Sequence, residues 1–430
     1  MVLELSRRNA MAGAVGLVAG VPGKGKAMPE RDRISADLDR YIAFGNKASG
    51  GAGDTATGEW LEAELRRAGA ETVRQSFDTP FFSPKRAEVI AGEARVPVLP
   101  LAIVVPTGPT GVRGRLVRVE PGMPLPTMQG AIAWIELPYA RWSSALVKPI
   151  AETVRAATAA GAIAALLITN GPTGKAIALN ADGRTPLVDR PVAILAPEKA
   201  GPLRALLGAP IEVTLVLDGE GGRRPAFNLA ARWDRRKGSH VVVSTPRSGW
   251  TACAGERGPG IATWLSLARW APAALAAHNL LFLCNSGHEY ENLGSEHALQ
   301  ALAPPPEETA LWLHLGANLA ARDWHEAGAG TLLPLPSADP QRFLVVSPAL
   351  LPLARRCFQG LAGLEVPYPA QTGSAGELST ILAAGYQHIV GIFGAHRFHH
   401  VAEDDSRCVE ARLVAPVRDA CQQILWQAVA

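Results

Sequence analysis

Three things are scarce in this sequence of 430 residues: cysteine, net charge and long apolar runs. Five scattered cysteines are too few for a disulfide-built scaffold, although one or two bridges stay open. A net charge of +3 without a basic stripe excludes nucleic acid as the main partner. No segment beyond residue 27 is long and apolar enough to span a bilayer, so no membrane span is expected in the mature chain.

The residues that are abundant indicate a globular protein with many turns. Apolar residues make up 48% of the chain and charged residues 19%, which suits one large or two medium domains with real cores. The 43 glycines and 34 prolines favour many turns over long helical bundles.

The N-terminus has the pattern of an export signal. Ser6, Arg7 and Arg8 precede a short apolar run at residues 10–21, and small residues follow up to Ala27. This resembles a twin-arginine signal at residues 1–27, which predicts a periplasmic or secreted protein. The alternative is a disordered basic tail.

The middle of the chain differs in pattern from the two ends. Residues 31–75 have apolar side chains at helical spacing, and a strand is expected at 71–77. Residues 81–222 alternate short Val/Ile/Leu strands with Pro/Gly turns, with a helix at 148–160. This pattern predicts a separate, mostly β module inserted after an N-terminal part at residues 28–80.

Residues 223–430 alternate strands and helices. Strands are expected at 228–233, 241–243, 280–284, 310–315, 342–346 and 388–393, and helices at 261–270, 293–302, 348–361, 376–384 and 409–429. The pattern predicts an α/β domain with a doubly wound sheet. Chemistry in such sheets collects in the loops that leave the carboxyl ends of the strands. Two reactive loops follow the strands at 241–243 and 280–284, and they hold Arg247, Cys253, Glu256, His288 and Glu289.

The order of helices, insert and α/β domain resembles the zinc-dependent aminopeptidase family, which also contains glutaminyl cyclases and transferrin receptors. Within the insert, residues 130–138, 148–170 and 191–208 resemble a protease-associated domain. The resemblance implies a mixed-sheet aminopeptidase-like domain. It also implies an insert that shapes substrate access and carries no catalytic residue.

The family's metal-site motifs are altered in this sequence. Where the family has H-x-D after a strand, this chain has Thr245, Pro246 and Arg247. Glu256 stands at the position of the bridging aspartate. In the E-E-x-G-L-x-G-S motif, His288 replaces the general base and Glu289 keeps the ligand position.

The remaining motifs point to residues further along the chain. Gly316 stands at the family's strand-end aspartate, with His314 and Asn318 beside it. His400, next to His399, matches the histidine ligand, and Glu377 matches the aspartate of S-D-H.

The resemblance therefore implies half of a two-metal site. Glu256, Glu289 and His400 are the expected ligands of one zinc; a second metal is not expected, and a site without metal stays open. Arg247 is expected to pair with Glu256 or to hold a substrate carboxylate or oxyanion. The residues expected to contact substrate are His314, Asn318, Glu377 and His399.

Three functions fit these residues. The first is a hydrolase or acyl-transfer enzyme that acts on a peptide or amide, with His288 moving the proton. The second is a non-catalytic pseudopeptidase that serves as a binding or scaffold protein. The third is a metal-free enzyme in which Cys253 and His288 form a thiolate–imidazole pair. For single residues, a helix-capping Glu289, a core His314 and an inert buried Cys253 are the structural alternatives.

Overall fold

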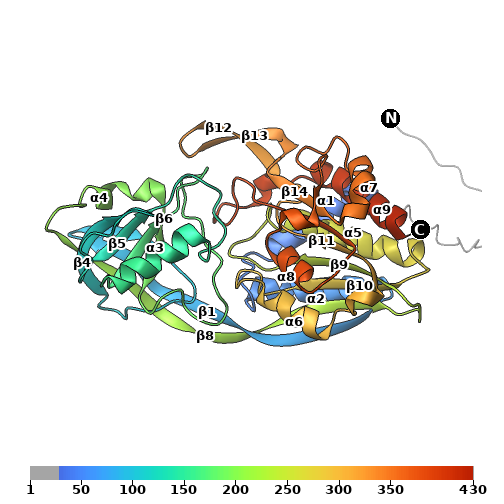
Figure 1. Ribbon diagram of the computed structural model, residues 1–430, viewed down its shortest axis with the longest axis horizontal. Coiled ribbons are helices and arrows are strands. Elements are labelled where there is room, and N and C mark those ends of the chain that lie inside the picture. Colours follow the sequence, from blue (N-terminus) through green and yellow to red (C-terminus); the bar gives the residue numbers. More distant parts are fainter. Residues whose placement is uncertain (1–28, 430) are drawn as a thin grey trace, which may run out of the picture.

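The computed structural model describes residues 29–429, which form two lobes joined by a pair of long strands (Figure 1). The expected export signal at residues 1–27 lies outside the described residues. None of the helices in the described part of the chain combines the length and apolar character needed to cross a membrane.

The larger lobe is built on a sheet whose central strands are parallel. β9 (His240–Pro246) lies between β10 (Asn279–Asn285) and β11 (Thr309–Leu315), and β11 pairs with β16 (Ile389–Gly394), all in parallel. β14 (Arg342–Val346) extends the sheet antiparallel to β16, and β15 (Tyr368–Pro369) follows it. Near-continuous apolar runs such as those of β9 and β10 are typical of parallel strands that are buried on both faces.

Helices cover both faces of this sheet. Val241 and Val243 of β9 pack into one hydrophobic core, whereas Val242 packs into another on the opposite face, because successive strand side chains point to opposite sides. The first face carries α1 (Glu30–Ala43), α2 (Ala52–Arg67), α5 (Gly258–Ala274), α7 (Leu351–Cys357) and α9 (Ala411–Val429), and the second carries α6 (Leu293–Ala301) and α8 (Glu377–Ala383). The doubly wound fold expected from the sequence is confirmed.

Two long antiparallel strands connect the lobes (Figure 1). They are β1 (Glu71–Ala91) and β8 (Glu212–Trp233). The sequence predicted separate short strands here, because prolines and glycines near the middle of each strand resemble turns. That division is wrong: residues 80–84 pair with residues 219–223 without interruption, and the register shifts only between Pro84 and Arg86. A two-stranded ribbon between lobes tolerates proline, because few neighbouring strands need its N–H.

The smaller lobe has its own core, and its strands join the sheet of the larger lobe through an antiparallel pairing with β8. β4 (Val112–Val119), β5 (Ile132–Glu136), β6 (Ala164–Ile168) and β7 (Val192–Leu195) are parallel. β3 (Leu99–Pro100) pairs with β7, β2 (Ala94–Pro97) pairs with β1, and α3 (Lys148–Ala159) and α4 (Gly201–Arg204) complete the lobe. Its likeness to a protease-associated domain stays a prediction. Single 3-10 turns occur at η1 (Pro197–Lys199), η2 (Pro306–Glu308), η3 (Pro348–Leu350), η4 (Ala370–Thr372) and η5 (Ser406–Cys408).

A hairpin that the sequence did not predict extends from the larger lobe towards the smaller one. Its strands are β12 (Arg322–Gly328) and β13 (Thr331–Ala338), seen at the top of Figure 1. Tyr139 of the smaller lobe donates to Glu326 of β12 at 2.5 Å, and Arg141 pairs with Asp339 at 2.9 Å. These contacts fasten the two lobes together on one side of the space between them.

Candidate functional site

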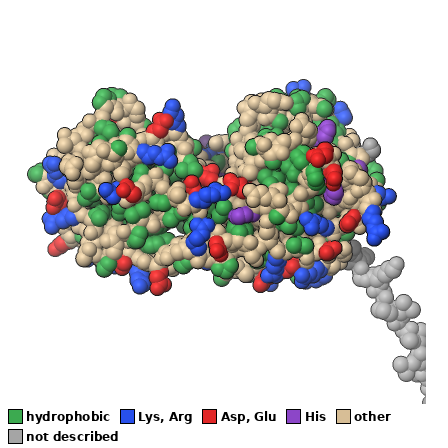
Figure 2. Space-filling model, turned by 60° about the horizontal axis from the view of Figure 1, so that its bottom comes forward, with side chains coloured by type: hydrophobic (Ala, Val, Ile, Leu, Met, Phe, Trp, Pro, Cys, Tyr) green, Lys and Arg blue, Asp and Glu red, His purple; other side chains and the backbone are tan. Residues whose placement is uncertain are grey.

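Loops from four parallel strands meet at one edge of the larger sheet, and those after β10, β11 and β16 line a cavity between the lobes. The loops follow β9, β10, β11 and β16, so they occupy the position where open α/β sheets bind ligands. The cavity measures about 630 Å³. Its wall includes residues 140–144 of the smaller lobe, Asn180, and the side chains of His288, His314, Glu377, His399 and His400. Figure 2 shows the two lobes with charges of both signs on the surface around the waist between them.

A carboxylate and two histidines come together beside this cavity. Ligand atoms of Glu256, His399 and His400, here called the Glu256 cluster, lie within 4.8 Å of one another, and all three side chains are buried. The two imidazole rings stack with centroids 3.9 Å apart, and Nε2 of His400 lies 3.3 Å from Oε1 of Glu256. Two ligands of a tetrahedral zinc with bonds of ~2.0 Å lie about 3.3 Å apart, so this separation suits a metal ion.

The hydrogen bonds of His400 fix which nitrogen faces the carboxylate. Nδ1 lies 2.9 Å from the carbonyl oxygen of Ala178, which can only accept, so Nδ1 carries a hydrogen. Nε2 of His400 then faces Glu256. In a neutral ring this nitrogen has a lone pair and no hydrogen, and the lone pair would repel the carboxylate. Neither oxygen of Glu256 has a hydrogen-bond partner among the described residues. A proton on Nε2 or a cation between the two groups satisfies this arrangement.

Arg257 is the positive charge next to Glu256. Its Nη2 lies 2.7 Å from Oε1 of Glu256, without hydrogen-bond geometry, and its Nε donates to the Ser248 carbonyl. Burial raises the pKa of Glu256, but the charges of Arg257 and His400 outweigh it and hold that pKa well below its usual range. Glu256 is therefore ionised at neutral pH, and Arg257 competes with any cation for the same oxygen.

Arg247 does not pair with Glu256, and that prediction is wrong. Its Nε lies 2.9 Å from Oδ1 of Asp54, and Nη1 and Nη2 donate to the carbonyls of Cys284 and Phe227 at 3.0 and 2.6 Å. The side chain is fully buried and does not line the cavity. Its guanidinium joins α2 to the carboxyl end of β10, which is a structural role.

The sequence predicted that Glu289 would be a metal ligand together with Glu256 and His400. Its side chain instead lies outside the Glu256 cluster. Its Oε1 accepts from the backbone N–H of Ser49 at 2.7 Å, and its Oε2 accepts from the Ser248 hydroxyl at 2.7 Å. Both oxygens are thus engaged in joining three loops. His399 takes the place beside Glu256 and His400 that Glu289 was expected to fill. Capping of α6 is not its role either, because the N-cap residue is Asn292 and both oxygens of Glu289 are engaged elsewhere.

His288 and Glu377 form an acid–base pair on the cavity wall. Nδ1 of His288 lies 3.7 Å from Oε1 of Glu377, and Oε2 of Glu377 accepts from the Asn285 amide at 3.0 Å. Burial, reinforced by the charge of Arg257, lowers the pKa of His288. Burial raises the pKa of Glu377, but contact with His288 outweighs this and the net pKa is lowered. At neutral pH the pair is a neutral imidazole beside a carboxylate. His288 Nδ1 and Glu377 Oε1 have no hydrogen-bond partner among the described residues, so in this structure the carboxylate acts on the imidazole through its charge.

His314 faces the cavity from the end of β11, whereas Asn318 does not. Ser244 Oγ accepts from the Trp312 indole at 2.8 Å and lies 2.9 Å from Nδ1 of His314, so its own hydrogen is available to that nitrogen. When Ser244 donates to Nδ1, Nε2 of His314 carries the hydrogen; the second lone pair of the hydroxyl also allows it to accept from Nδ1 in the other tautomer. Asn318 is buried, donates to the Gln341 carbonyl at 3.0 Å, and is not among the residues that line the cavity.

Cys253 has the surroundings of an inert thiol. It is fully buried, its Sγ lies 3.4 Å from the Thr251 carbonyl oxygen, and its φ of 52° lies in the left-handed region. Burial, and then the carboxylates of Glu256 and Asp404, raise the pKa of the thiol well above its usual value. A neutral thiol is a poor nucleophile. All five cysteines are free.

The smaller lobe contributes to the site, although no catalytic residue was expected in it. Ser143 Oγ lies 3.0 Å from Nε2 of His399, and the Ala178 carbonyl orients His400. Ser144 donates to Glu291, a carboxylate on the cavity wall. The available signal was the polar end of the loop after β5, where two serines follow Trp142.

We predict that His314 makes stability depend on pH. Burial lowers the pKa of His314 to about 4, below its ordinary value of 6.5. The unfolded chain then binds more protons than the folded one between these values, so stability is present above about pH 6.5 and is lost as pH falls towards about 4. At ~1.36 kcal/mol per pKa unit, His314 contributes at most about 3 kcal/mol to this loss.

The measurement is urea unfolding of the wild-type protein and of His314→Asn at about pH 7 and about pH 4.5. Asparagine keeps an acceptor for Ser244 but does not titrate. The stability advantage of the wild type over this variant should shrink at the lower pH. An unchanged difference would contradict the prediction. His388→Asn, at an exposed position, controls for the loss of a histidine as such.

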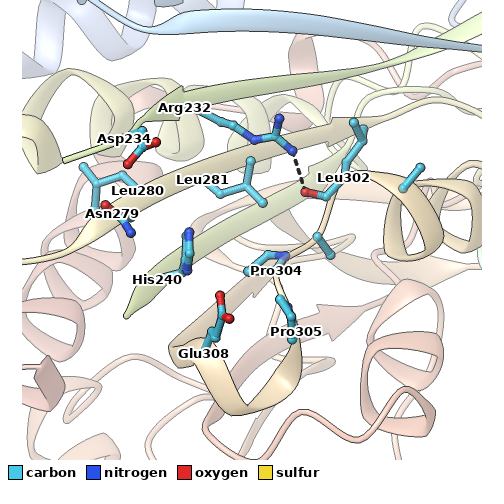
Figure 3. Close-up of a pocket in the computed structure, with 12 residues that line it drawn as sticks. Arg232, Asp234, His240, Asn279, Leu280, Leu281, Leu302, Pro304, Pro305 and Glu308 are labelled. Atoms are coloured by element: carbon cyan, nitrogen blue, oxygen red, sulfur yellow. Dashed lines mark hydrogen bonds between the residues drawn. The ribbon is translucent and has the colours of Figure 1, made fainter. Parts of the chain in front are cut away.

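A second cavity, of about 390 Å³, lies at the opposite edge of the sheet (Figure 3). Its lining includes His240 and Asn279, which begin β9 and β10, and Glu308, which precedes β11. Arg232 spans it and donates to the Leu302 carbonyl at 2.8 Å. The amino ends of parallel strands are not where such folds bind ligands, and none of the expected site residues lies here.

Comparison with known proteins identifies the fold. The zinc aminopeptidase of Bacillus subtilis superposes with a TM-score of 0.72 at 16% identity, covering 93% of this chain and 95% of that one. A peptidase M28 precursor from Shewanella amazonensis gives 0.66 at 15% identity, with 93% and 92% covered. The aminopeptidase of Aneurinibacillus sp. strain AM-1 gives 0.65 at 15% identity, with 93% of each chain covered. No family model and no curated protein sequence matches the chain. The protein therefore has the fold of the zinc aminopeptidases, and the expected resemblance is confirmed at that level.

Proposed function

We propose that this protein is a hydrolase or acyl-transfer enzyme that acts on a peptide or amide bond in the cavity between its two lobes. The observation that supports this most is the joint placement of an acid–base pair and the Glu256 cluster at one cavity. His288 and Glu377 line the wall together with His399 and His400. Polar groups that converge in a pocket at the carboxyl edge of an α/β sheet are the usual mark of an active site.

The residues of the chain divide the chemistry among themselves. His288, neutral at neutral pH, accepts the proton of the attacking water or amine, and Glu377 stabilises the imidazolium that forms. His314 presents an N–H to the substrate carbonyl from the end of β11. Glu291, with one oxygen held by Ser144, offers a carboxylate to a substrate ammonium group.

The Glu256 cluster fits one zinc ion. It supplies one carboxylate and two imidazoles, and the separation of 3.3 Å between Glu256 and His400 suits two ligands of one ion. A bound zinc supplies Lewis acidity, which polarises a carbonyl and lowers the pKa of a bound water. Arg257 must release Oε1 of Glu256 for that ligand set to form.

One observation favours a second candidate, a binding protein on a peptidase fold. Arg257 already neutralises Glu256, as a guanidinium can do in place of a metal. In that case the cavity would hold a peptide or amide ligand without turning it over, and its histidines and carboxylates would act as hydrogen-bonding groups.

We also propose that the protein is exported and that residues 81–222 are a protease-associated insert that governs access to the cavity. The twin-arginine pattern in the first residues supports export. The insert's own core and its contribution of Ser143 and the Ala178 carbonyl to the site support a role in substrate access.

The test combines metal analysis with turnover. We expect protein purified without chelator to contain about one zinc per chain at the Glu256 cluster, which is the metal that the ligand variants below remove. We also expect it to cleave aminoacyl anilides with a free amino group faster than their N-acetylated forms. Glu256→Gln and His400→Ala should each lower metal content and turnover together, because each removes one of three ligands. His388→Ala, an exposed histidine at the other end of β16, is the matched control and should change neither.

The outcomes separate the two candidates. Protein without zinc that gains no activity from added metals, yet binds peptides in a way that His400→Ala abolishes, would support the binding protein and overturn the enzyme. Turnover without zinc that survives in Glu256→Gln would remove the metal from the proposal but keep the His288–Glu377 pair.

A further inference from the structure

A second group of metal-binding side chains lies behind the candidate active site. Ligand atoms of His396, Asp404 and Cys408, here called the Cys408 cluster, lie within 4.8 Å of one another. His396 and Asp404 come from the loop after β16, and Cys408 ends η5 just beyond it. All three are fully buried, and none lines the cavity between the lobes.

His396 has no hydrogen-bond partner for either ring nitrogen among the described residues, although its exposed fraction is 0%. A buried imidazole without partners is costly, and native structures rarely leave such groups unsatisfied. The nearest charged atom is Oδ2 of Asp404, 3.4 Å from Nε2. That separation is close to the ~3.3 Å between two ligands of a tetrahedral zinc.

Gly255 makes room for the three side chains to converge. A Cβ at this position would lie 2.7 Å from Cε1 of His396, 2.9 Å from Oδ1 of Asp404 and 3.0 Å from Cβ of Cys408. All three side chains therefore approach the backbone of residue 255 so closely that only glycine fits there. The carbonyl oxygen of Glu403 lies 3.9 Å from Sγ of Cys408.

We propose that the Cys408 cluster binds a structural zinc ion. A thiolate, an imidazole and a carboxylate form a mixed donor set that zinc accepts, whereas calcium and magnesium require oxygen ligands. The Glu403 carbonyl or a water would complete four-coordination. Burial of every ligand is typical of a closed structural site rather than an open catalytic one.

The ion would hold the two loops that form the Glu256 cluster. Asp404 accepts from the backbone N–H of Gly255 at 2.7 Å and of Glu256 at 3.0 Å. His399 and His400 lie in the same loop between His396 and Asp404. An ion bound to both ends of that loop would thus fix the spacing of Glu256 from the two histidines.

Cobalt distinguishes this site from the Glu256 cluster, because only the Cys408 cluster contains sulfur. The full chain is produced in minimal medium with Co²⁺ as the added transition metal, so that the ion enters while the protein folds. We expect a near-ultraviolet thiolate-to-cobalt charge-transfer band in the wild type. Cys408→Ser should lose the band and about one equivalent of cobalt, as measured by mass spectrometry. His400→Ala, which affects only the Glu256 cluster, should keep the band.

Cys253→Ser is the matched control, because Cys253 is also a fully buried thiol near Glu256. It should keep the band. A wild-type protein without the band overturns the proposal whatever the variants do, and leaves His396 and Asp404 as an ion pair. A band that persists in Cys408→Ser, or one that disappears in Cys253→Ser, also overturns it. The wild-type measurement keeps the test decisive if Cys408→Ser fails to fold.

Discussion

Replacing His288 by alanine is expected to lower kcat by about two to four orders of magnitude, with a much smaller change in KM. The imidazole is the neutral base on the cavity wall, and Glu377 lies 3.7 Å from its Nδ1 to stabilise the charge that it acquires. Steady-state kinetics on the best peptide or anilide substrate provide the measurement. Because burial lowers the pKa of His288, the acid limb of kcat should lie below pH 6.5.

Glu377→Gln separates a proton-transfer role from a purely structural one. Without the carboxylate, the pKa of His288 falls further, so the acid limb of the kcat profile should move to lower pH while kcat decreases. A Glu377 that merely packs against its neighbours would lower stability without moving this limb. Full activity in His288→Ala would rule out the assigned base, and His388→Ala controls for loss of a histidine as such.

The sequence predicted the elements of the larger lobe well, because their signals are local. Buried parallel strands such as residues 241–243 and 280–284 are short apolar runs, and the helices between them have regular spacing. The ribbon of β1 and β8 was missed because its stability depends on pairing across more than a hundred residues, while its prolines and glycines signal turns. The hairpin of β12 and β13 is held partly by contacts with the other lobe, which no local pattern contains.

For the site, the sequence located the loops but not the partners within them. Position after a strand brings Glu256, His288, His314 and His400 to one edge of the sheet, and this much follows from topology. Which side chain meets which depends on direction and on distant residues. Glu289 is captured by the Ser49 backbone and by Ser248, so His399 fills its place beside Glu256. The spacing of residues in the sequence predicts neither of these hydrogen bonds of Glu289.

The two arginines of the loop after β9 also show that the sequence does not predict which side chains become partners. Both Arg247 and Arg257 are buried, and each needs a carboxylate partner. Arg257 pairs with its neighbour Glu256, whereas Arg247 pairs with Asp54, far away in α2. The two residues occupy neighbouring positions of the family motifs, which suggested an ion pair between Arg247 and Glu256. The direction of the chain after β9 instead turns the Arg247 side chain towards α2. Arg247 is therefore part of the core.

Replacing Arg247 by methionine is consequently expected to destabilise the protein by about 3–5 kcal/mol, because it leaves the Asp54 carboxylate buried without its partner. Urea unfolding measures this loss. The exposed pair of Arg407 and Asp405 offers a matched control, and Arg407→Met should cost less than about 1 kcal/mol.

The double variant Arg247→Met with Asp54→Asn tests whether loss of the Arg247–Asp54 ion pair causes the predicted destabilisation. It removes both charges, so it should be less destabilised than the sum of the two single variants. Asp54 also accepts from Gly50 and Ser286, both at Oδ2, and the amide oxygen of asparagine can keep both bonds. Recovery will be incomplete because methionine does not replace the hydrogen bonds of Arg247 to the Cys284 and Phe227 carbonyls. If Arg247 is structural, the folded fraction of Arg247→Met keeps its kcat under conditions where it is stable. A large loss of kcat with unchanged stability would instead return Arg247 to the catalytic role that its position in the motif suggests, and would show that its guanidinium leaves Asp54 when substrate binds.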